Sequence, residues 1–243
     1  QRQRGRVHYR WAWTNMYWYN DYKSFIREFN NYKSTLSAFP SATDLELYSN
    51  MVTSLRGLSL LQPEEIAALG VSFPDEETKF INFLTVVANE VDRKCLSLIA
   101  KSHLAIHRAM DALDQGGSAD EYLENLRTYF NDSQEFIEYP FEHFRPLTDV
   151  LGKALPDNKT FDTLVDTVAS ISEKRSSLRT AGEAFFRRGL QKREAKLHKE
   201  SVVYFGKAVL KLAKEETQED LFHVLLALGE SYASLGLIYA ANN

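Results

Sequence analysis

Apolar and aromatic residues recur every three or four positions along most of the chain, which is the spacing of one face of an α-helix. The first such stretch runs through Trp18, Tyr22, Phe25, Phe29, Tyr32 and Leu36. A helix with this spacing is expected to bury these rings on one face. No stretch shows the strict alternation of apolar and polar residues that marks a half-buried β-strand. The pattern therefore predicts an all-α protein.

Short polar or proline-containing breaks divide the pattern into successive helices. Pro40 ends the first helix, and Thr43 with Glu46 has the spacing of a capping box for the second. Pro63 opens a short helical piece that Gly70 closes. Serial helices joined by brief breaks are typical of an array of antiparallel helical hairpins.

The middle of the chain carries the longest unbroken helical pattern. It extends from Phe80 to Leu113, between Pro74 and Gly116, and predicts a single helix that is the longest in the chain. Ser118 and Glu121 have the spacing of another capping box. Beyond it, residues 146–156, which begin and end with proline, are expected to hold one more short helix.

One pattern of large, small and aromatic residues appears twice in the last quarter of the chain. The first copy is Phe185, Gly189, Ser201, Phe205 and Ala208, and the second is Leu225, Leu228, Gly229, Tyr232, Gly236 and Ala241. Each copy predicts two short helices packed as a hairpin. A glycine inside a helix costs about 1 kcal/mol relative to alanine, so the two glycines at matching places indicate close helix packing.

The second copy is similar to the tetratricopeptide repeat, in which Leu-Gly, Tyr and Ala follow at fixed spacing along a helix pair. Leu228, Gly229, Tyr232 and Ala241 lie at that spacing. In the first copy, Arg188 and Lys192 stand where the family has Leu and Tyr. This resemblance implies a solenoid of tetratricopeptide-like hairpins at the C-terminus.

The two copies are further apart than usual for this family. Gly189 and Gly229 lie 40 positions apart, whereas the family repeats about every 34 residues. The polar segment Lys214–Asp220 is expected to form the longer link.

The resemblance also implies where a partner binds, because members of the family commonly hold a peptide in a groove lined by the first helix of each pair. The partner-binding residues predicted in this way are Glu183, Phe186, Leu190, Arg193, His223, Leu226 and Glu230, with Glu194 and Ser234 on the same face. Some members bind a carboxylate with Lys and Asn on this face, and the corresponding residues here are Phe186, Leu190, Leu226 and Glu230. An amphipathic segment is therefore the better fit. The alternative is that the same side chains only contact the neighbouring helix.

The composition limits the kind of protein. The chain has 243 residues, 44% of them hydrophobic, and a formal net charge of −4, which fits a folded protein and argues against one that binds nucleic acid over its whole surface. The single cysteine, Cys95, favours a reducing compartment, so we expect a cytoplasmic protein. No run of apolar residues is long enough to span a membrane.

We predict three parts along the chain: a basic linker or arm at residues 1–12, an N-terminal helical region at 13–157, and tetratricopeptide-like hairpins at 158–243. The chain lacks an initial methionine and ends within the last hairpin, so it is expected to be a fragment of a larger protein. The N-terminal arginines and aromatic residues could instead bind single-stranded nucleic acid by phosphate contact and base stacking. The favoured interpretation is a linker leading into a helix that buries its rings.

Two histidine patterns are candidates for chemistry. His103 and His107 lie one helical turn apart and Asp111 extends the same side, but this set is too small to predict a metal site. Arg193 and His198 resemble the Arg-His motif of the all-helical ribonucleases called HEPN domains. In that resemblance His198 would assist attack by the RNA 2′-hydroxyl and Arg193 would stabilise charge on the phosphate.

A concentrated basic segment surrounds this motif and comprises Arg187, Arg188, Lys192, Arg193, Lys196, His198 and Lys199. We interpret it as a solvated helix face, although it could meet an acidic partner or a phosphate backbone. No nucleophile or phosphate-binding motif occurs. The sequence thus predicts a non-catalytic protein-interaction module, a scaffold or sensor without a cofactor. The alternative is an RNA-binding or RNA-cleaving helical domain.

Overall fold

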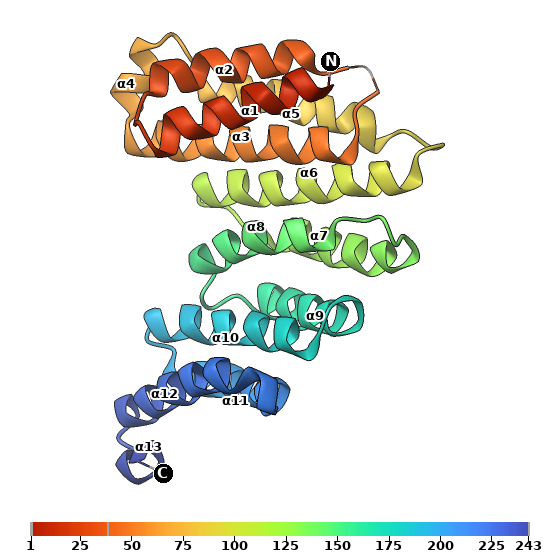
Figure 1. Ribbon diagram of the computed structural model, residues 1–243. Helices are drawn as coiled ribbons and strands as arrows, with labels where there is room; N and C mark the ends of the chain where they lie inside the picture. Colours follow the sequence, from red (N-terminus) through yellow and green to blue (C-terminus); the bar gives the residue numbers. More distant parts are fainter. Residues whose placement is uncertain (1, 38, 243) are drawn as a thin grey trace. The chain divides into compact units, whose positions relative to one another are not determined.

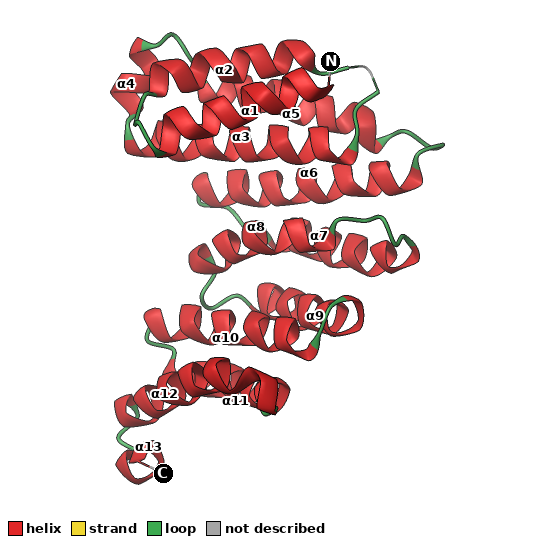
Figure 2. Cartoon of the chain, in the orientation of Figure 1, coloured by secondary structure: helices red, strands yellow, loops and turns green. Residues whose placement is uncertain are grey.

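The computed structural model describes residues 2–37 and 39–242, and it consists of α-helices joined by short loops and turns, with no strand in this part of the chain (Figure 2). Helices that follow one another along the chain pack together (Figure 1). The all-α array of antiparallel helical hairpins is therefore confirmed. The chain forms two compact units, Gln1–Leu104 and Ala105–Asn243. The domain boundary expected at residue 157 lies inside the second unit.

The first unit contains five complete helices among the residues described, and α6 continues from it into the second unit. The bounds are α1 Arg2–Tyr17, α2 Tyr22–Thr35, α3 Ala42–Leu61, α4 Pro63–Ala68, α5 Phe73–Ala88 and α6 Lys94–Asp114. The core forms around the ring of Tyr48 on α3. Its centroid lies 6.1 Å from that of Phe29 on α2 and 4.7 Å from that of Phe80 on α5. Burial raises the pKa of the Tyr48 phenol.

The N-terminal segment differs from the prediction. Residues 2–12, which we interpreted as a linker or arm, belong to α1, and this helix packs closely along α2. Trp18 lies in the turn between α1 and α2 and is largely exposed. The expectation that it shares a buried helix face with Phe25 and Phe29 is wrong for Trp18 and confirmed for the two phenylalanines.

Local capping accounts for two further corrections. The capping box of α3 is formed by Ser41 and Asp44, not by Thr43 and Glu46. Ser118 contacts Asp120 and not Glu121, and α7 has no side-chain cap.

The single long helix predicted from Pro74 to Gly116 is two helices. The first of them, α5, ends at Ala88, and the second, α6, begins at Lys94. The hydroxyl of Ser97 donates a hydrogen bond to the carbonyl of Ala88 and thereby satisfies a group at the end of α5. The short helix expected between the two prolines at 146 and 156 begins earlier, at Phe141, and holds Pro146 inside it.

The second unit contains the rest of the array. Its bounds are α7 Asp120–Asp132, η1 Ser133–Glu135, α8 Phe141–Ala154, α9 Lys159–Arg175, α10 Leu178–Glu194, α11 His198–Leu212, η2 Glu215–Thr217, α12 Gln218–Ser234 and α13 Ile238–Asn242. The link predicted at Lys214–Asp220 is shorter, because α12 begins at Gln218.

The repeated pattern of the last quarter corresponds to a structural repeat. α10 and α12 each have 17 residues, and both their first and last residues are 40 positions apart. Both helices end with the same turn, in which the residue after the cap, Lys196 or Gly236, has a positive φ. The next amide, of Leu197 or Leu237, donates to a carbonyl five residues back, as in a Schellman motif. The 40-residue period therefore extends from the helices to their turns.

Lys196 occupies a backbone position that favours glycine, with φ of 63°. Replacing it with glycine is expected to raise the free energy of unfolding by about 0.5–1 kcal/mol, because a side chain in the left-handed region is strained. Lys199→Gly, in the first turn of α11, is the control and should destabilise the helix by a similar amount. Urea titration followed by circular dichroism measures both, and a loss of stability in Lys196→Gly would contradict the prediction.

Candidate functional site

The predicted partner-binding residues lie on the first helices of two successive hairpins. Glu183, Phe186, Leu190 and Arg193 are on α10, and His223, Leu226 and Glu230 are on α12. On each helix they are three or four residues apart, so each set shares one helix face. Glu194 is exposed at the end of α10, and Ser234 is exposed at the end of α12.

The charged members of this set form ion pairs within the array. Glu183 on α10 accepts from Arg145 on α8 at 3.3 Å and from Arg179 on its own helix. Arg193 pairs with Glu230, and Arg179 also pairs with Asp220, at 2.8 Å, so two ion pairs join α10 to α12. Burial opposes the charge on Arg145, but the carboxylates of Glu142 and Glu183 leave its pKa raised. These charges hold neighbouring helices together.

The apolar members differ between the two helices. Phe186 and Leu190 on α10 are half-buried, and the ring of Phe186 lies 5.8 Å from that of Phe205 on α11. Leu226 on α12 is 54% exposed, beside Phe222, which is 64% exposed, and Leu225. The three exposed α12 side chains form what we call the α12 apolar strip.

The structural repeat shows what covers the equivalent surface of α10. The residues of α10 that lie 40 positions before the strip are Gly182, Phe185 and Phe186. Gly182 faces the side chain of Leu212 and Phe185 is buried, because the C-terminal half of α11 covers this part of α10. On α12, the described residues of α13 reach Gly229, where an added Cβ would lie 3.3 Å from the carbonyl oxygen of Ala241.

The basic segment is not a solvated helix face throughout, because two of its cations are buried. Arg188 and Lys192 are each 1% exposed, and both pair with Asp162 on α9. The Nε atom of Arg188 lies 2.8 Å from Asp162 Oδ1, and the Nζ atom of Lys192 lies 2.8 Å from Asp162 Oδ2. Sequence reasoning missed this cluster.

Arg188 also closes the end of α8. Its guanidinium donates to the carbonyls of Gly152, Leu155 and Pro156, at 3.2, 2.9 and 3.1 Å. Carbonyls at a helix C-terminus carry partial negative charge and lack partners within the helix, so a cation there satisfies both needs. The cluster therefore has a structural role. Burial and the carboxylates of Asp162 and Asp166 raise the pKa of the adjacent Tyr204.

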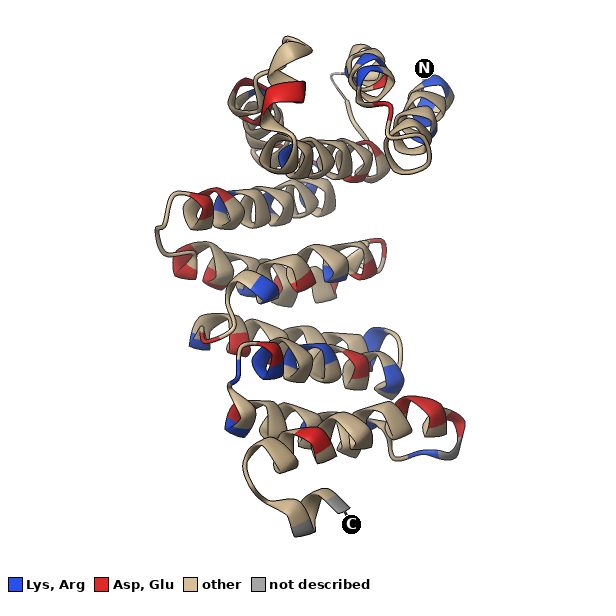
Figure 3. Cartoon of the chain, turned by 90° about the vertical axis from the view of Figure 1, so that its left-hand side faces the viewer, with Lys and Arg blue, Asp and Glu red and all other residues tan. Residues whose placement is uncertain are grey.

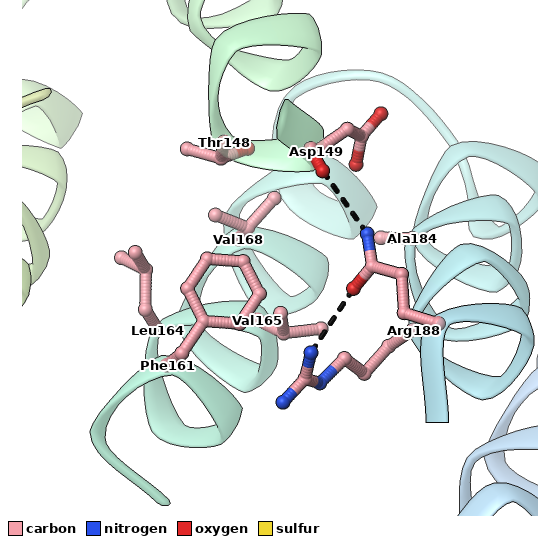
Figure 4. Close-up of a pocket in the computed structure, with 9 residues that line it drawn as sticks. Thr148, Asp149, Phe161, Leu164, Val165, Val168, Ala184 and Arg188 are labelled. Atoms are coloured by element: carbon pink, nitrogen blue, oxygen red, sulfur yellow. Dashed lines mark hydrogen bonds between the residues drawn. The ribbon is translucent and has the colours of Figure 1, made fainter. Parts of the chain in front are cut away.

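A small cavity of about 20 Å³ lies beside this cluster. Figure 4 shows Phe161, Val165 and Val168 on one side of it and Arg188 with Ala184 on the other. Gln191 joins α10 to α8, since it accepts from Arg188 on α10 at 3.1 Å and donates to the carbonyl of Asp149 on α8 at 3.2 Å, as the dashed lines in Figure 4 mark. A cavity of this volume holds about one water molecule and no organic ligand.

The residues that the sequence suggested for RNA cleavage or metal binding lie on α6, α10 and α11. Arg193 is in the last turn of α10 and His198 is the first residue of α11. His103 and His107 on α6 are buried. In the part of the chain that the structure describes, no group of three or more His, Cys, Asp or Glu side chains is arranged to hold a metal ion.

Comparison with known proteins gives no relative for this chain: no family model, curated protein or solved structure matches it. The fold defines an all-α helical-hairpin array, and the resemblance to the tetratricopeptide repeat stays a prediction. No helix among the described residues is both long and apolar enough to cross a membrane.

Proposed function

We propose that the second unit is a non-catalytic protein-interaction module of the cytoplasm that binds an amphipathic helix of a partner protein along the α12 apolar strip. The observation that carries the proposal is the exposure of Phe222, Leu225 and Leu226 on one helix. Contiguous large apolar side chains at a surface are characteristic of protein-interaction sites. Their positions, three and four residues apart, suit the ridge of a second helix.

The structural repeat supports a helix as the bound element. On α10, the equivalent surface is covered by α11, which contributes Phe205, Ala208 and Leu212 to the core. A partner helix with apolar residues at similar spacing would cover α12 in the same way. His223 and Glu230 border the strip, and the paired residues of α10, including Glu183 and Arg193, support it from the neighbouring helix.

Photo-crosslinking in the cells that make the protein tests this proposal. A photoreactive phenylalanine analogue at position 222 is expected to form an adduct with one partner protein, and Leu226→Glu in the same chain should reduce that adduct about tenfold or more, because it places a charge in the apolar contact. The same analogue at Leu210, an exposed leucine of α11, is the matched control. Helix content by circular dichroism should be equal in all variants.

Two outcomes would contradict the proposal. One is an adduct that joins position 222 to another part of the same polypeptide, since the strip would then be internal packing. The other is equal labelling from positions 222 and 210, which would mean that the strip has no preferred partner.

A further inference from the structure

Helix α1 in the first unit presents an outer face of arginine and aromatic residues. Arg6, Arg10, Trp13 and Tyr17 are separated by four, three and four residues, so they form one strip along the helix. Arg4, Val7 and Trp11 form a second strip beside it. All seven side chains are exposed. The expectation that this segment buries its rings is therefore wrong for α1.

The opposite face of α1 explains this orientation, because it is occupied by contacts to α2. Gly5 and Ala12 are buried, and an added Cβ at Gly5 would lie 2.7 Å from the hydroxyl oxygen of Thr35. The Nδ1 atom of His8 lies 2.7 Å from Glu28 Oε2. Burial alone would raise the pKa of Glu28, but hydrogen bonds from His8, Arg27 and Asn31 leave it lowered. Small residues and the contact between His8 and Glu28 thus fix which face of α1 remains outside.

The arginine side chains of α1 lack partners in the part of the chain that the structure describes. Those of Arg2, Arg4, Arg6 and Arg10 make no ion pair or hydrogen bond there, and all four are exposed. The helix contains no Asp or Glu, in a chain whose formal net charge is −4. Figure 3 shows the basic positions spaced along the N-terminal helix. Concentrated, unpaired positive charge of this kind attracts an anionic partner.

The rings on α1 and in the following turn add flat, exposed surfaces. The ring centroids of Trp13 and Tyr17, both exposed, are 4.4 Å apart, and the half-buried ring of Tyr9 lies 5.8 Å from that of Trp13. Trp11 and Trp18 are 57% and 79% exposed. Exposed rings beside cations can stack on unpaired bases while the cations contact phosphates.

We propose that the outer face of α1, with the turn that follows it, binds single-stranded nucleic acid. The face suits this ligand better than a membrane. A helix that lies in a membrane surface separates a charged face from an apolar one. On α1 the arginines and aromatic rings share the same strips, and Val7 is the one aliphatic residue in these two strips. Trp, Tyr and Arg are also enriched at protein interfaces, so the test below compares single strands with an acidic polypeptide.

The chain offers a direct readout, because its three tryptophans, Trp11, Trp13 and Trp18, all lie on this surface. Adding single-stranded oligouridylate or oligothymidylate to the full chain is expected to quench their fluorescence without a blue shift. The slope of log affinity against log salt should be close to −0.7 for each phosphate that is neutralised.

Two variants with equal charge change locate the binding site. Arg6→Glu with Arg10→Glu is expected to weaken binding about tenfold or more and to reduce the salt slope by about 1.4. Lys196→Glu with Lys199→Glu, in the basic segment of the second unit, should leave binding unchanged. Trp11→Ala with Trp18→Ala should weaken binding about 30-fold or more, because stacking on two bases is lost. These exposed side chains can be replaced without loss of helix content, which circular dichroism checks.

Other anionic ligands distinguish the alternatives. Polyglutamate and duplex DNA should bind more weakly than the single strands and leave the fluorescence nearly unchanged. Vesicles of phosphatidylserine and phosphatidylcholine should give no blue shift. Equal binding of polyglutamate, a blue shift with vesicles, an unaffected Arg6→Glu/Arg10→Glu variant, or loss of binding only in the Lys196→Glu/Lys199→Glu variant would each overturn the proposal.

Discussion

Replacing Asp162 with alanine is expected to lower the free energy of unfolding of the second unit by about 3–5 kcal/mol, because it leaves two buried cations without their carboxylate. Arg188 and Lys192 are almost completely buried, and Asp162 lies within 2.8 Å of a nitrogen atom of each. Arg188 would keep its hydrogen bonds to the end of α8, but Lys192 would lose the one charged partner that the described residues provide. Urea titration followed by circular dichroism measures the loss.

Asp166, one turn further along α9, provides the matched control. It pairs with Lys207 on α11 at 2.6 Å, but both side chains are considerably exposed. Solvent screens such a pair, so Asp166→Ala is expected to cost less than about 1 kcal/mol. Equal losses in the two variants would show that burial of Arg188 and Lys192 does not govern the strength of the Asp162 contacts.

The position of this cluster was visible in the sequence, although its geometry was not. Arg188 and Lys192 stand where the tetratricopeptide pattern has Leu and Tyr, which are residues that pack inward. Two cations at inward positions require a buried anion or free carbonyls. Their partners, Asp162 and the carbonyls after α8, lie more than 25 residues earlier in the chain, so periodicity alone could not identify them.

The presence of helices and their 40-residue repeat were predictable because both depend on the local spacing of apolar residues. The first and last residues of each helix were not, because they depend on contacts that this spacing does not report. The apolar period continues across the break between Ala88 and Lys94, where neither Pro nor Gly marks the end of a helix. It also continues from α1 into α2, although Asp21 caps α2 by accepting from the amide of Ser24 at 3.0 Å. Trp18, in the turn after α1, was therefore assigned to a buried face that begins only after this cap.

The α12 apolar strip is a second feature that the sequence predicted only in part. Leu226 was predicted from the repeat pattern as a partner-binding residue, but Phe222 and Leu225 were not included in that set. Their α10 equivalents are Gly182 and Phe185, and these are covered by α11. Which residues of a repeat stay exposed depends on the helix that packs next to it, and the spacing of residues within the repeat does not report that contact.

Gly189 is the position where the packing prediction from the sequence can be tested most sharply. An added Cβ there would lie 2.5 Å from Cδ1 of Phe205, whose ring is fully buried. Because the ring is fully buried, either the ring or the two helices α10 and α11 must shift to make room for the methyl group. Gly189→Ala is therefore expected to destabilise the protein by about 1–3 kcal/mol, although alanine is the better helix former.

Gly206 on α11 provides a control for which the opposite change in stability is expected. It also lies inside a helix, but an added Cβ would meet nothing within 4 Å. Gly206→Ala is expected to stabilise the protein by about 0.5–1 kcal/mol through helix propensity alone. Both variants add one methyl group to neighbouring helices of the same hairpin, so the difference in their urea midpoints isolates the contact with Phe205. If Gly189→Ala stabilises the protein as much as Gly206→Ala does, close approach of α10 and α11 is not the reason for a glycine at position 189.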